Sequence, residues 1–229
     1  MRIPLLFLLV HLLTAGPLLR AQQKGDQAQA VAEIERLGGK IKRDPEGRDS
    51  AVIAVSLDRV KDADACLKQM KDWTMLLGLQ VSQSAATDAG LKNLAGLTGL
   101  RQLFLYDIPM TDAGFGSVKK LTDLRQLTIG HTRITDAGLA NVEGLTKLEE
   151  LYIFENNITD KGLKHIKGLA NLRRLVLAET QLTDAGLTEF KGLTKLQDLV
   201  VAKTRVTEAG VKEFQKWLPK VRVITGLPK

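Results

Sequence analysis

The sequence predicts an α/β solenoid, in which short strands and short helices alternate in stacked units and parallel strands form one continuous face. Two observations predict it. The tetrapeptide Thr87-Asp88-Ala89-Gly90 returns in the same or a closely similar form at intervals of 24 residues. The apolar positions keep the same phase, with steps of three residues that suit a helix and a turn, and one step of two that suits a strand. The returns of the tetrapeptide begin at Thr111, Thr135, Thr159, Thr183 and Thr207.

Each unit therefore holds one strand and one helix. In one unit, Leu151 and Ile153 are the alternating apolar residues of the strand, and Thr135 is placed to cap the helix while Asp136 complements its dipole. The glycine of the tetrapeptide is expected to allow close approach of helix and sheet. Left-handed glycines are expected to end the helices, at Gly96, Gly144, Gly168 and Gly192.

The segments outside the repeats complete the predicted organisation. Met1-Arg2 precedes a run that is apolar to Leu13 except for His11, which predicts a secretory signal peptide, with an uncleaved membrane anchor as the alternative. An open solenoid end exposes leucines, so a helix and a hairpin are expected to cover the first unit. The predicted division is a signal peptide at 1–21, a flexible leader at 22–26, an N-terminal cap at 27–60, repeats at 61–224 and a tail at 225–229.

The repeat pattern Leu-x-x-Leu-x-Leu-x-x-(Thr/Asn)-x-Ile-Thr-Asp-Ala-Gly-Leu resembles the leucine-rich repeat family, over about residues 52–224. It is most similar to the cysteine-containing-like repeats of F-box-associated receptors and to secreted bacterial leucine-rich repeat proteins. The resemblance implies a right-handed curved solenoid, with the sheet on the concave face and helices on the convex face, and a function in protein binding. Threonine or asparagine replaces the cysteine of many such receptors and an F-box is not found ahead of the repeats, so we expect no ubiquitin-ligase role.

Composition excludes several classes of function. The formal net charge is +7, but basic residues are scattered and form no block or aromatic-interleaved stripe, so we expect no nucleic-acid partner. Cys66 is the single cysteine and cannot form an internal disulfide. We expect it to be a packed thiol, because it replaces the small signature glycine. No cysteine and histidine cluster is present, so neither a metal nor a cofactor is expected.

The candidate binding surface is the concave face, formed by strand side chains between the buried leucines. Both tyrosines and two of the six phenylalanines occupy these positions, although aromatics make up only 4% of the chain. Exposed aromatics are typical of contact hot spots, the alternative being that the rings only shield the sheet. Gly130 is expected to leave a shallow notch, with His131 near Glu155. The predicted partner-binding residues are Phe104, Tyr106, Thr128, Gly130, His131, Glu150, Tyr152, Phe154 and Arg174.

These patterns favour an exported, non-enzymatic recognition module in the periplasm, the cell envelope or the secreted fraction, with a protein as its partner. A membrane contact is expected only if the N-terminal segment is an uncleaved anchor. One alternative is a structural or adhesive envelope protein that associates through lysines of the outer helices, at Lys164, Lys167 and Lys191. Another is a small-ligand or glycan binder at the Gly130 notch. Catalysis is not expected, because the open face has no means to exclude water.

Overall fold

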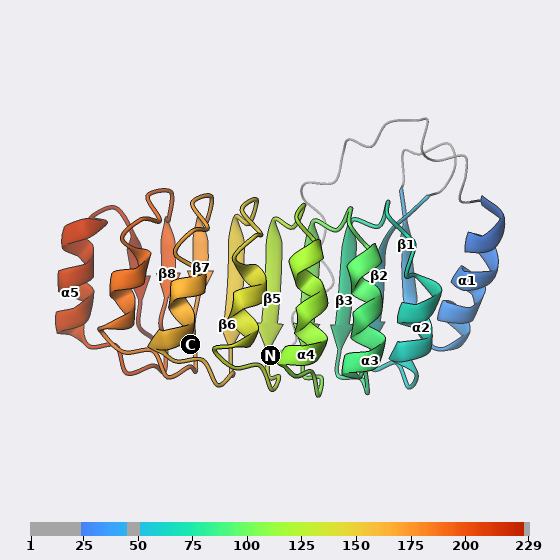
Figure 1. Ribbon diagram of the computed structural model, residues 1–229, viewed down its shortest axis with the longest axis horizontal. Helices are drawn as coiled ribbons and strands as arrows, with labels where there is room; N and C mark the ends of the chain where they lie inside the picture. The colour runs from blue at the N-terminus through green and yellow to red at the C-terminus, as the bar shows by residue number, and fades with distance from the viewer. Residues whose placement is uncertain (1–23, 45–50, 227–229) are drawn as a thin grey trace.

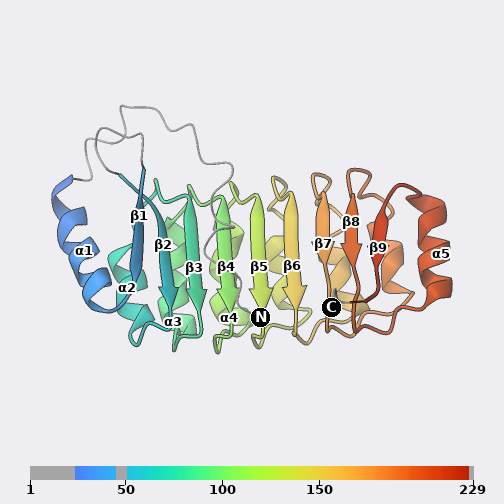
Figure 2. The same ribbon diagram turned by 180° about the vertical axis from the view of Figure 1, so that it is seen from behind.

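The computed structural model describes residues 24–44 and 51–226. These residues form an elongated array in which helices cover one face of a single sheet (Figures 1 and 2). The predicted signal peptide at 1–21 lies outside the described residues, as do the first two residues of the predicted leader and the end of the predicted tail.

The sheet places its nine strands in chain order. The first two strands pair antiparallel, and every later strand is parallel to the one before it. This open sheet with helices on one face confirms the predicted fold class, a curved leucine-rich repeat solenoid with an N-terminal helix and hairpin. The strands are β1 (Lys40–Arg43), β2 (Val52–Asp58), β3 (Gly78–Ser82), β4 (Gln102–Tyr106), β5 (Gln126–Gly130), β6 (Glu150–Phe154), β7 (Arg174–Val176), β8 (Asp198–Val200) and β9 (Arg222–Ile224).

The helical segments are short, and several are 3-10 rather than α-helices. A 3-10 helix has three residues per turn, which explains why the apolar positions of these segments recur at steps of three. The α-helices are α1 (Lys24–Arg36), α2 (Ala63–Gln69), α3 (Asp88–Leu91), α4 (Asp112–Phe115) and α5 (Glu208–Trp217). The 3-10 helices are η4 (Lys92–Gly96), η5 (Gly116–Lys120), η6 (Gly138–Val142), η7 (Asp160–His165) and η8 (Gly186–Phe190).

The parallel strands are in register at a spacing of one unit. Leu103 pairs with Leu127, and Leu127 pairs with Leu151, so equivalent leucines stack along the array. All three are at most 2% exposed. Burying one leucine side chain contributes about 1.5–3 kcal/mol. The stack therefore forms one core that no single unit could build.

An aspartate of each unit holds the threonine of the next. The carboxylate of Asp136 accepts a bond of 2.8 Å from the backbone nitrogen of Thr159 and one of 2.6 Å from its hydroxyl. The Thr159 hydroxyl in turn accepts from the nitrogen of Lys161 and so caps η7. The predicted cap Thr135 accepts in the same way from the nitrogen of Ala137, but η6 begins only at Gly138, so Ala137 and not Thr135 is its N-cap. The equivalent pairs are Asp64 and Thr87, Asp88 and Thr111, Asp112 and Thr135, Asp160 and Thr183, and Asp184 and Thr207.

The signature glycine makes room for this carboxylate, not for the sheet as the sequence predicts. A Cβ atom added to Gly138 would overlap Oδ1 of Asp112, and the same overlap recurs at the other five signature glycines. Cys66 stands at the glycine position of the first unit. No repeat precedes this unit, so no aspartate carboxylate of this series occupies the space next to Cys66. The Cys66 side chain is fully buried against the cap. Burial raises the pKa of its thiol to about 11, aided by Asp62 and Glu33, which agrees with the prediction of a packed thiol.

The expectation of left-handed glycines at helix ends is wrong. Among the described glycines only Gly38 has a positive φ, of 95°. Gly38 follows α1 and ends it, whereas the four expected glycines have ordinary φ values. An added Cβ atom at Gly144 or Gly168 would meet nothing within 4 Å. The 3-10 turns of each unit pass into the next strand without a left-handed residue at these positions.

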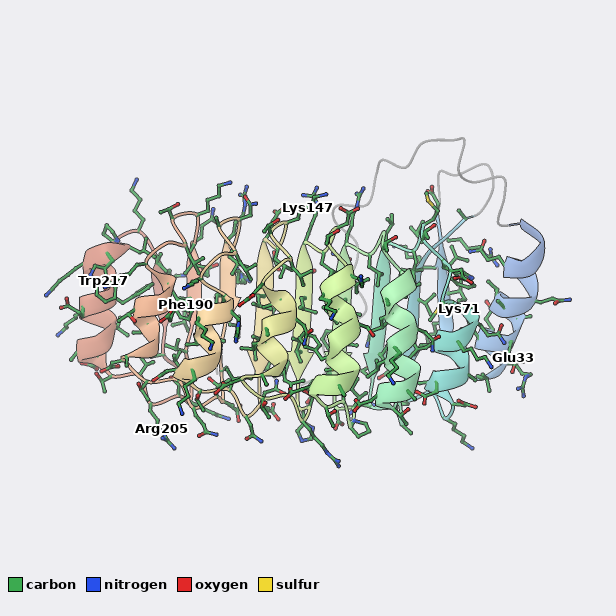
Figure 3. The ribbon with its side chains drawn as sticks, in the orientation of Figure 1. Glu33, Lys71, Lys147, Phe190, Arg205 and Trp217 are labelled. Carbon is green, nitrogen blue, oxygen red and sulfur yellow. The ribbon has the colours of Figure 1, made fainter. Side chains whose placement is uncertain are left out.

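Different structures cover the two ends of the core. At the N-terminal end, α1 begins at Lys24, within the predicted leader, and inserts the fully buried Ile34 into the core. At the C-terminal end, α5 buries Phe214 and carries Trp217 (Figure 3). Nζ of Lys191 lies 3.8 Å from the ring centre of Trp217. Lys191 thus takes part in a cation-π contact that helps close this end.

The glycine environment predicts opposite effects for two alanine substitutions. Gly138→Ala forces the Asp112 carboxylate from its bonds to Thr135 and is expected to lower the free energy of unfolding by about 1–3 kcal/mol. Gly144→Ala is the matched control, because its added methyl meets open space. We expect it to change the free energy of unfolding by between zero and about +1 kcal/mol. Urea denaturation followed by circular dichroism measures both, and equal effects would contradict the assigned role of the signature glycine.

Candidate functional site

Four rings gather on the open face of the sheet, around Tyr106. The Tyr106 ring centre lies 5.7 Å from that of Phe154, 6.0 Å from that of Phe104 and 6.3 Å from that of His131. Phe104 and Tyr106 stand two residues apart on β4, and Phe154 comes from β6. These four side chains, Phe104, Tyr106, His131 and Phe154, are called the aromatic cluster below. Its three phenylalanine and tyrosine side chains are partly exposed, and His131 is exposed.

The notch expected at Gly130 is not open. A Cβ atom added to Gly130 would overlap the ring of Phe154, so that ring already covers the glycine. Gly130 allows the Phe154 ring to lie over β5, and this ring contacts Tyr106 on β4. Thr128 is also buried, at 7% exposure. Of the predicted contact residues, Gly130 and Thr128 therefore support the surface from beneath and do not form it.

His131 belongs to a row of residues in the left-handed conformation, each directly after a strand or at the equivalent position of a unit. Their φ values lie between 46° and 56°, and the conformation costs about 1–2 kcal/mol for a residue with a side chain. The left-handed conformation lets the chain turn at the end of the strand while the backbone nitrogen still donates to the next unit. For example, the nitrogen of His131 donates to the Phe154 carbonyl at 3.1 Å. The row consists of Arg59, Gln83, Asp107, His131, Glu155, Glu179 and Lys203.

The partner of His131 within this row differs from the expected one. Nδ1 of His131 lies 2.8 Å from Oδ1 of Asp107, on the preceding unit, whereas the sequence places Glu155 beside it. Both neighbours are one unit away, so the sequence period alone could not choose between them. Glu179 is also paired with a residue of this row one unit away, because Nζ of Lys203 donates to its carboxylate at 2.9 Å. The row thus forms a charged edge beside the aromatic cluster.

Tyr152 stands apart from the aromatic cluster and joins a polar group. Its hydroxyl donates to Oε2 of Glu150 at 2.6 Å. On the following strands, Asp198 accepts one bond of 2.8 Å from Arg174 and one of 2.7 Å from Arg222. These five side chains are called the polar network. The predicted site residues Glu150, Tyr152 and Arg174 are therefore brought together, but in a second group beside the rings.

Electrostatics hold both tyrosines in the neutral form. Burial raises the pKa of Tyr152, and the bond to Glu150 and the charge of that carboxylate raise it further. Burial also raises the pKa of Tyr106, with the negative charges of Glu155, Asp107 and Glu179 adding to the effect. Partial burial opposes ionisation of Asp198, but its bonds from Arg222 and Arg174 outweigh this and lower its pKa.

Asp107, Asp198 and Arg222 also belong to the site, although they are not among the residues predicted from the sequence. The sequence does contain a signal for them, because Arg174, Asp198 and Arg222 stand 24 residues apart, and equivalent positions in a solenoid become neighbours.

In the described ranges, no group of three or more histidine, cysteine, aspartate or glutamate side chains is arranged to hold a metal ion. The helices of the same ranges are too short or too polar to cross a membrane.

The raised pKa values predict a late tyrosine titration. The chain has two tyrosines, and in the folded state neither should reach half ionisation at the ordinary value of about pH 10. Because folding raises these pKa values, the stability they contribute is present below that pH and is lost as the pH rises through the folded pKa. Absorbance of tyrosinate during alkaline titration measures this, with denatured protein as the reference. The variant Tyr152→Phe isolates Tyr106. A folded-state midpoint at or below that of denatured protein would contradict the assignment.

Comparison with known proteins supports the repeat architecture. The sequence model of the family described as Leucine rich repeat matches residues 122–182. A search of curated proteins gives no significant match. Among solved structures, the internalin inlF from Listeria monocytogenes is similar with a TM-score of 0.64 and 24% identity, covering 77% of this chain and 48% of that one. Internalin C2 (inlC2) from the same organism gives a TM-score of 0.63 and 17% identity, covering 87% of this chain and 92% of that one.

The chain thus spans about half the length of the internalin inlF and nearly the whole of the internalin C2 structure. At these identities the likeness concerns the fold. Together, the match at residues 122–182 and the stacked strands support a leucine-rich repeat protein, whose fold is suited to protein interaction.

Proposed function

We propose that this chain is an exported, non-enzymatic recognition protein that binds a protein partner through its concave face, with the aromatic cluster as the main contact. The observation that carries the proposal is the gathering of rare aromatic side chains around Tyr106 on an open sheet. Rings held by neighbours lose little conformational freedom on binding and bury a large area. A protein surface is the partner that an extended, shallow face of this kind fits.

The surroundings of the aromatic cluster suit such a contact. Val176 and Val200 lie side by side on β7 and β8, next to Tyr152 on β6, and both valines are partly exposed. They extend the apolar surface along the array. The charged row at the strand ends and the polar network lie on its two sides, as a polar rim surrounds the apolar centre of many interfaces. We infer that the partner crosses several strands.

The arrangement of acid and base groups supports a non-enzymatic role. His131 is paired with Asp107, Glu150 with Tyr152, and Glu179 with Lys203. These three groups are each paired with a separate neighbour, whereas catalysis needs such groups to converge on one reacting atom. The face is also open to water. Binding without chemistry is the simpler use of this surface.

Other observations support the finer parts of the proposal. The apolar segment within residues 1–21 supports export, and the Thr-Asp contact between units supports the repeat subtype with Thr-Asp-Ala-Gly-Leu helix starts. The resemblance of the repeats to secreted bacterial leucine-rich repeat proteins supports a bacterial source. The adhesive alternative would use Lys164, Lys167 and Lys191, but Lys191 is engaged with Trp217. The small-ligand alternative relied on space at Gly130, which Phe154 covers. Protein recognition is therefore the function we favour.

Removing two contacting rings should abolish partner capture without unfolding the protein. The variant Tyr106→Ala with Phe154→Ala removes the ring pair at 5.7 Å, and hot-spot losses of about 2 kcal/mol each predict at least a tenfold weaker capture. The measurement is quantitative affinity capture from the envelope and secreted fractions of the producing cells.

The matched control is Lys161→Ala with Lys164→Ala, on the exposed surface of η7. This variant removes as many side chains from the convex side and should capture the partner as the unchanged protein does. Circular dichroism confirms that both variants are folded. Undiminished capture by the ring variant, or equal loss in both variants, would refute the role of the aromatic cluster.

A further inference from the structure

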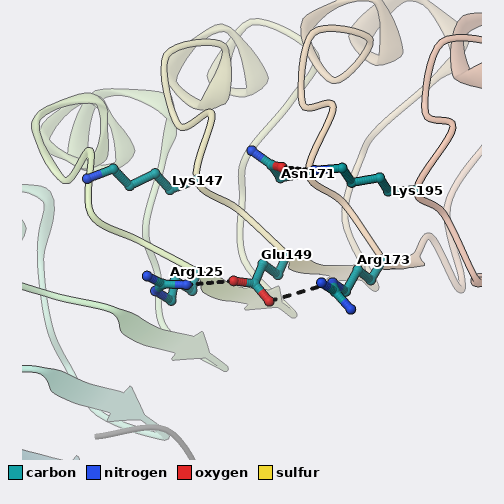
Figure 4. A pocket seen from close by; sticks show the side chains of 6 residues that line it. All are labelled: Arg125, Lys147, Glu149, Asn171, Arg173 and Lys195. Atoms are coloured by element: carbon teal, nitrogen blue, oxygen red, sulfur yellow. Dashed lines mark hydrogen bonds and ion pairs between the residues drawn. The ribbon is translucent and has the colours of Figure 1, made fainter. Parts of the chain in front are cut away.

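A pocket opens at the other edge of the sheet, where the strands begin. Its lining comes from consecutive units and forms two rows (Figure 4). Residues of the first row each stand immediately before a strand, and residues of the second row stand two positions earlier in their units. The first row consists of Arg125, Glu149 and Arg173, and the second consists of Lys147, Asn171 and Lys195.

The first row places a carboxylate between two guanidinium groups. Nη1 of Arg125 lies 2.7 Å from Oε1 of Glu149, and Nε of Arg173 lies 3.8 Å from Oε2 of the same side chain. An arginine has five N–H donors, so each of the two retains donors that Glu149 does not use. Both arginine side chains are more than half exposed, at 52% and 58%. Glu149 therefore orients two positively charged forks and leaves them accessible.

The second row adds two ammonium groups held by neighbours. Lys195 donates to the Asn171 side chain at 2.7 Å, and Asn171 is itself fixed by a bond of 2.8 Å to the Thr146 carbonyl. Lys147 donates to Asp123 at 2.5 Å. Counting Asp123, four basic groups face two carboxylates here, so the pocket keeps an excess of positive charge. Each ammonium group has three donors, of which these bonds use one.

We propose that this pocket binds a tetrahedral oxyanion of the phosphate class. Arg125 and Arg173 supply planar forks that match oxyanion geometry, and Lys147 and Lys195 supply point charges. Parallel strands stand about 4.8 Å apart, so the arginines, two units from each other, are separated by roughly 10 Å at the backbone and can approach an anion from two sides. The site is separate from the aromatic cluster and does not depend on the proposed partner.

Two sources present this chemistry: free phosphate, and the phosphate of an anionic phospholipid headgroup. The first experiment titrates the full chain with inorganic phosphate and follows the heat of binding by calorimetry. Ionic strength is held constant by lowering the chloride concentration as phosphate is added. Saturable binding is expected, and the variant Arg125→Gln with Arg173→Gln should weaken it by about tenfold or more, because two charge-assisted contacts are lost.

The matched control is Arg133→Gln with Arg205→Gln, which removes the same charge from the opposite edge of the array. Figure 3 shows Arg205 and the pocket residue Lys147 at these opposite edges. Both control arginines are exposed. Phosphate affinity should be unchanged in this variant, and circular dichroism verifies that both variants fold.

The second experiment distinguishes the sources. Co-sedimentation with phosphatidylglycerol vesicles, compared with phosphatidylcholine vesicles, supports a headgroup ligand if binding requires Arg125 and Arg173. Binding of phosphate without vesicle binding supports a free anion. The proposal is overturned if up to about 10 mM phosphate and phosphatidylglycerol vesicles both fail to bind, or if the control variant loses binding as much as the pocket variant.

Discussion

The contact between an aspartate of one unit and the threonine of the next is the interaction on which the array depends. Stacked leucines form much of the core, but apolar contacts are not directional and would tolerate a shift between units. The carboxylate of Asp136 satisfies both the backbone nitrogen and the hydroxyl of Thr159 and so fixes one relative position. The signature glycine is required because any side chain there would occupy the carboxylate's place. Cys66 shows the converse, since no preceding unit places such a carboxylate against the first unit, and a thiol is accommodated there.

This repeated contact makes the sheet a regular support for other side chains. Positions one unit apart become neighbours on adjacent strands, so a solenoid turns a sequence period into rows on its surface. At the strand ends, left-handed residues such as His131 keep backbone bonds to the next unit while presenting their side chains along the edge. Their backbone strain is offset by the bond that each turn preserves. The surface is consequently organised by the backbone, and residue identity along each row decides its chemistry.

The rows assign different chemistry to different parts of the molecule. The middle of the open face carries the aromatic cluster, and the polar network lies beside it. The edge where the strands begin carries the basic pocket, in which Glu149 lies between two arginines. These surfaces share no side chain, so a protein partner and an anion would be bound through separate residues. Because the units are coupled by fixed contacts, both sites sit on one continuous support.

The 24-residue period, with leucines in constant phase, was enough to predict the architecture. It also predicted that Phe104, Tyr106 and Phe154 lie on the same face. Periodicity could not tell which of two equivalent neighbours a side chain chooses, and so His131 was placed beside Glu155 when it contacts Asp107. It also gave no information on how a ring lies, so the covering of Gly130 by Phe154 was missed. Side-chain direction, the role of the signature glycine and the meeting of two rows in a basic pocket could not be predicted from the period, because they depend on how side chains of neighbouring units pack against one another.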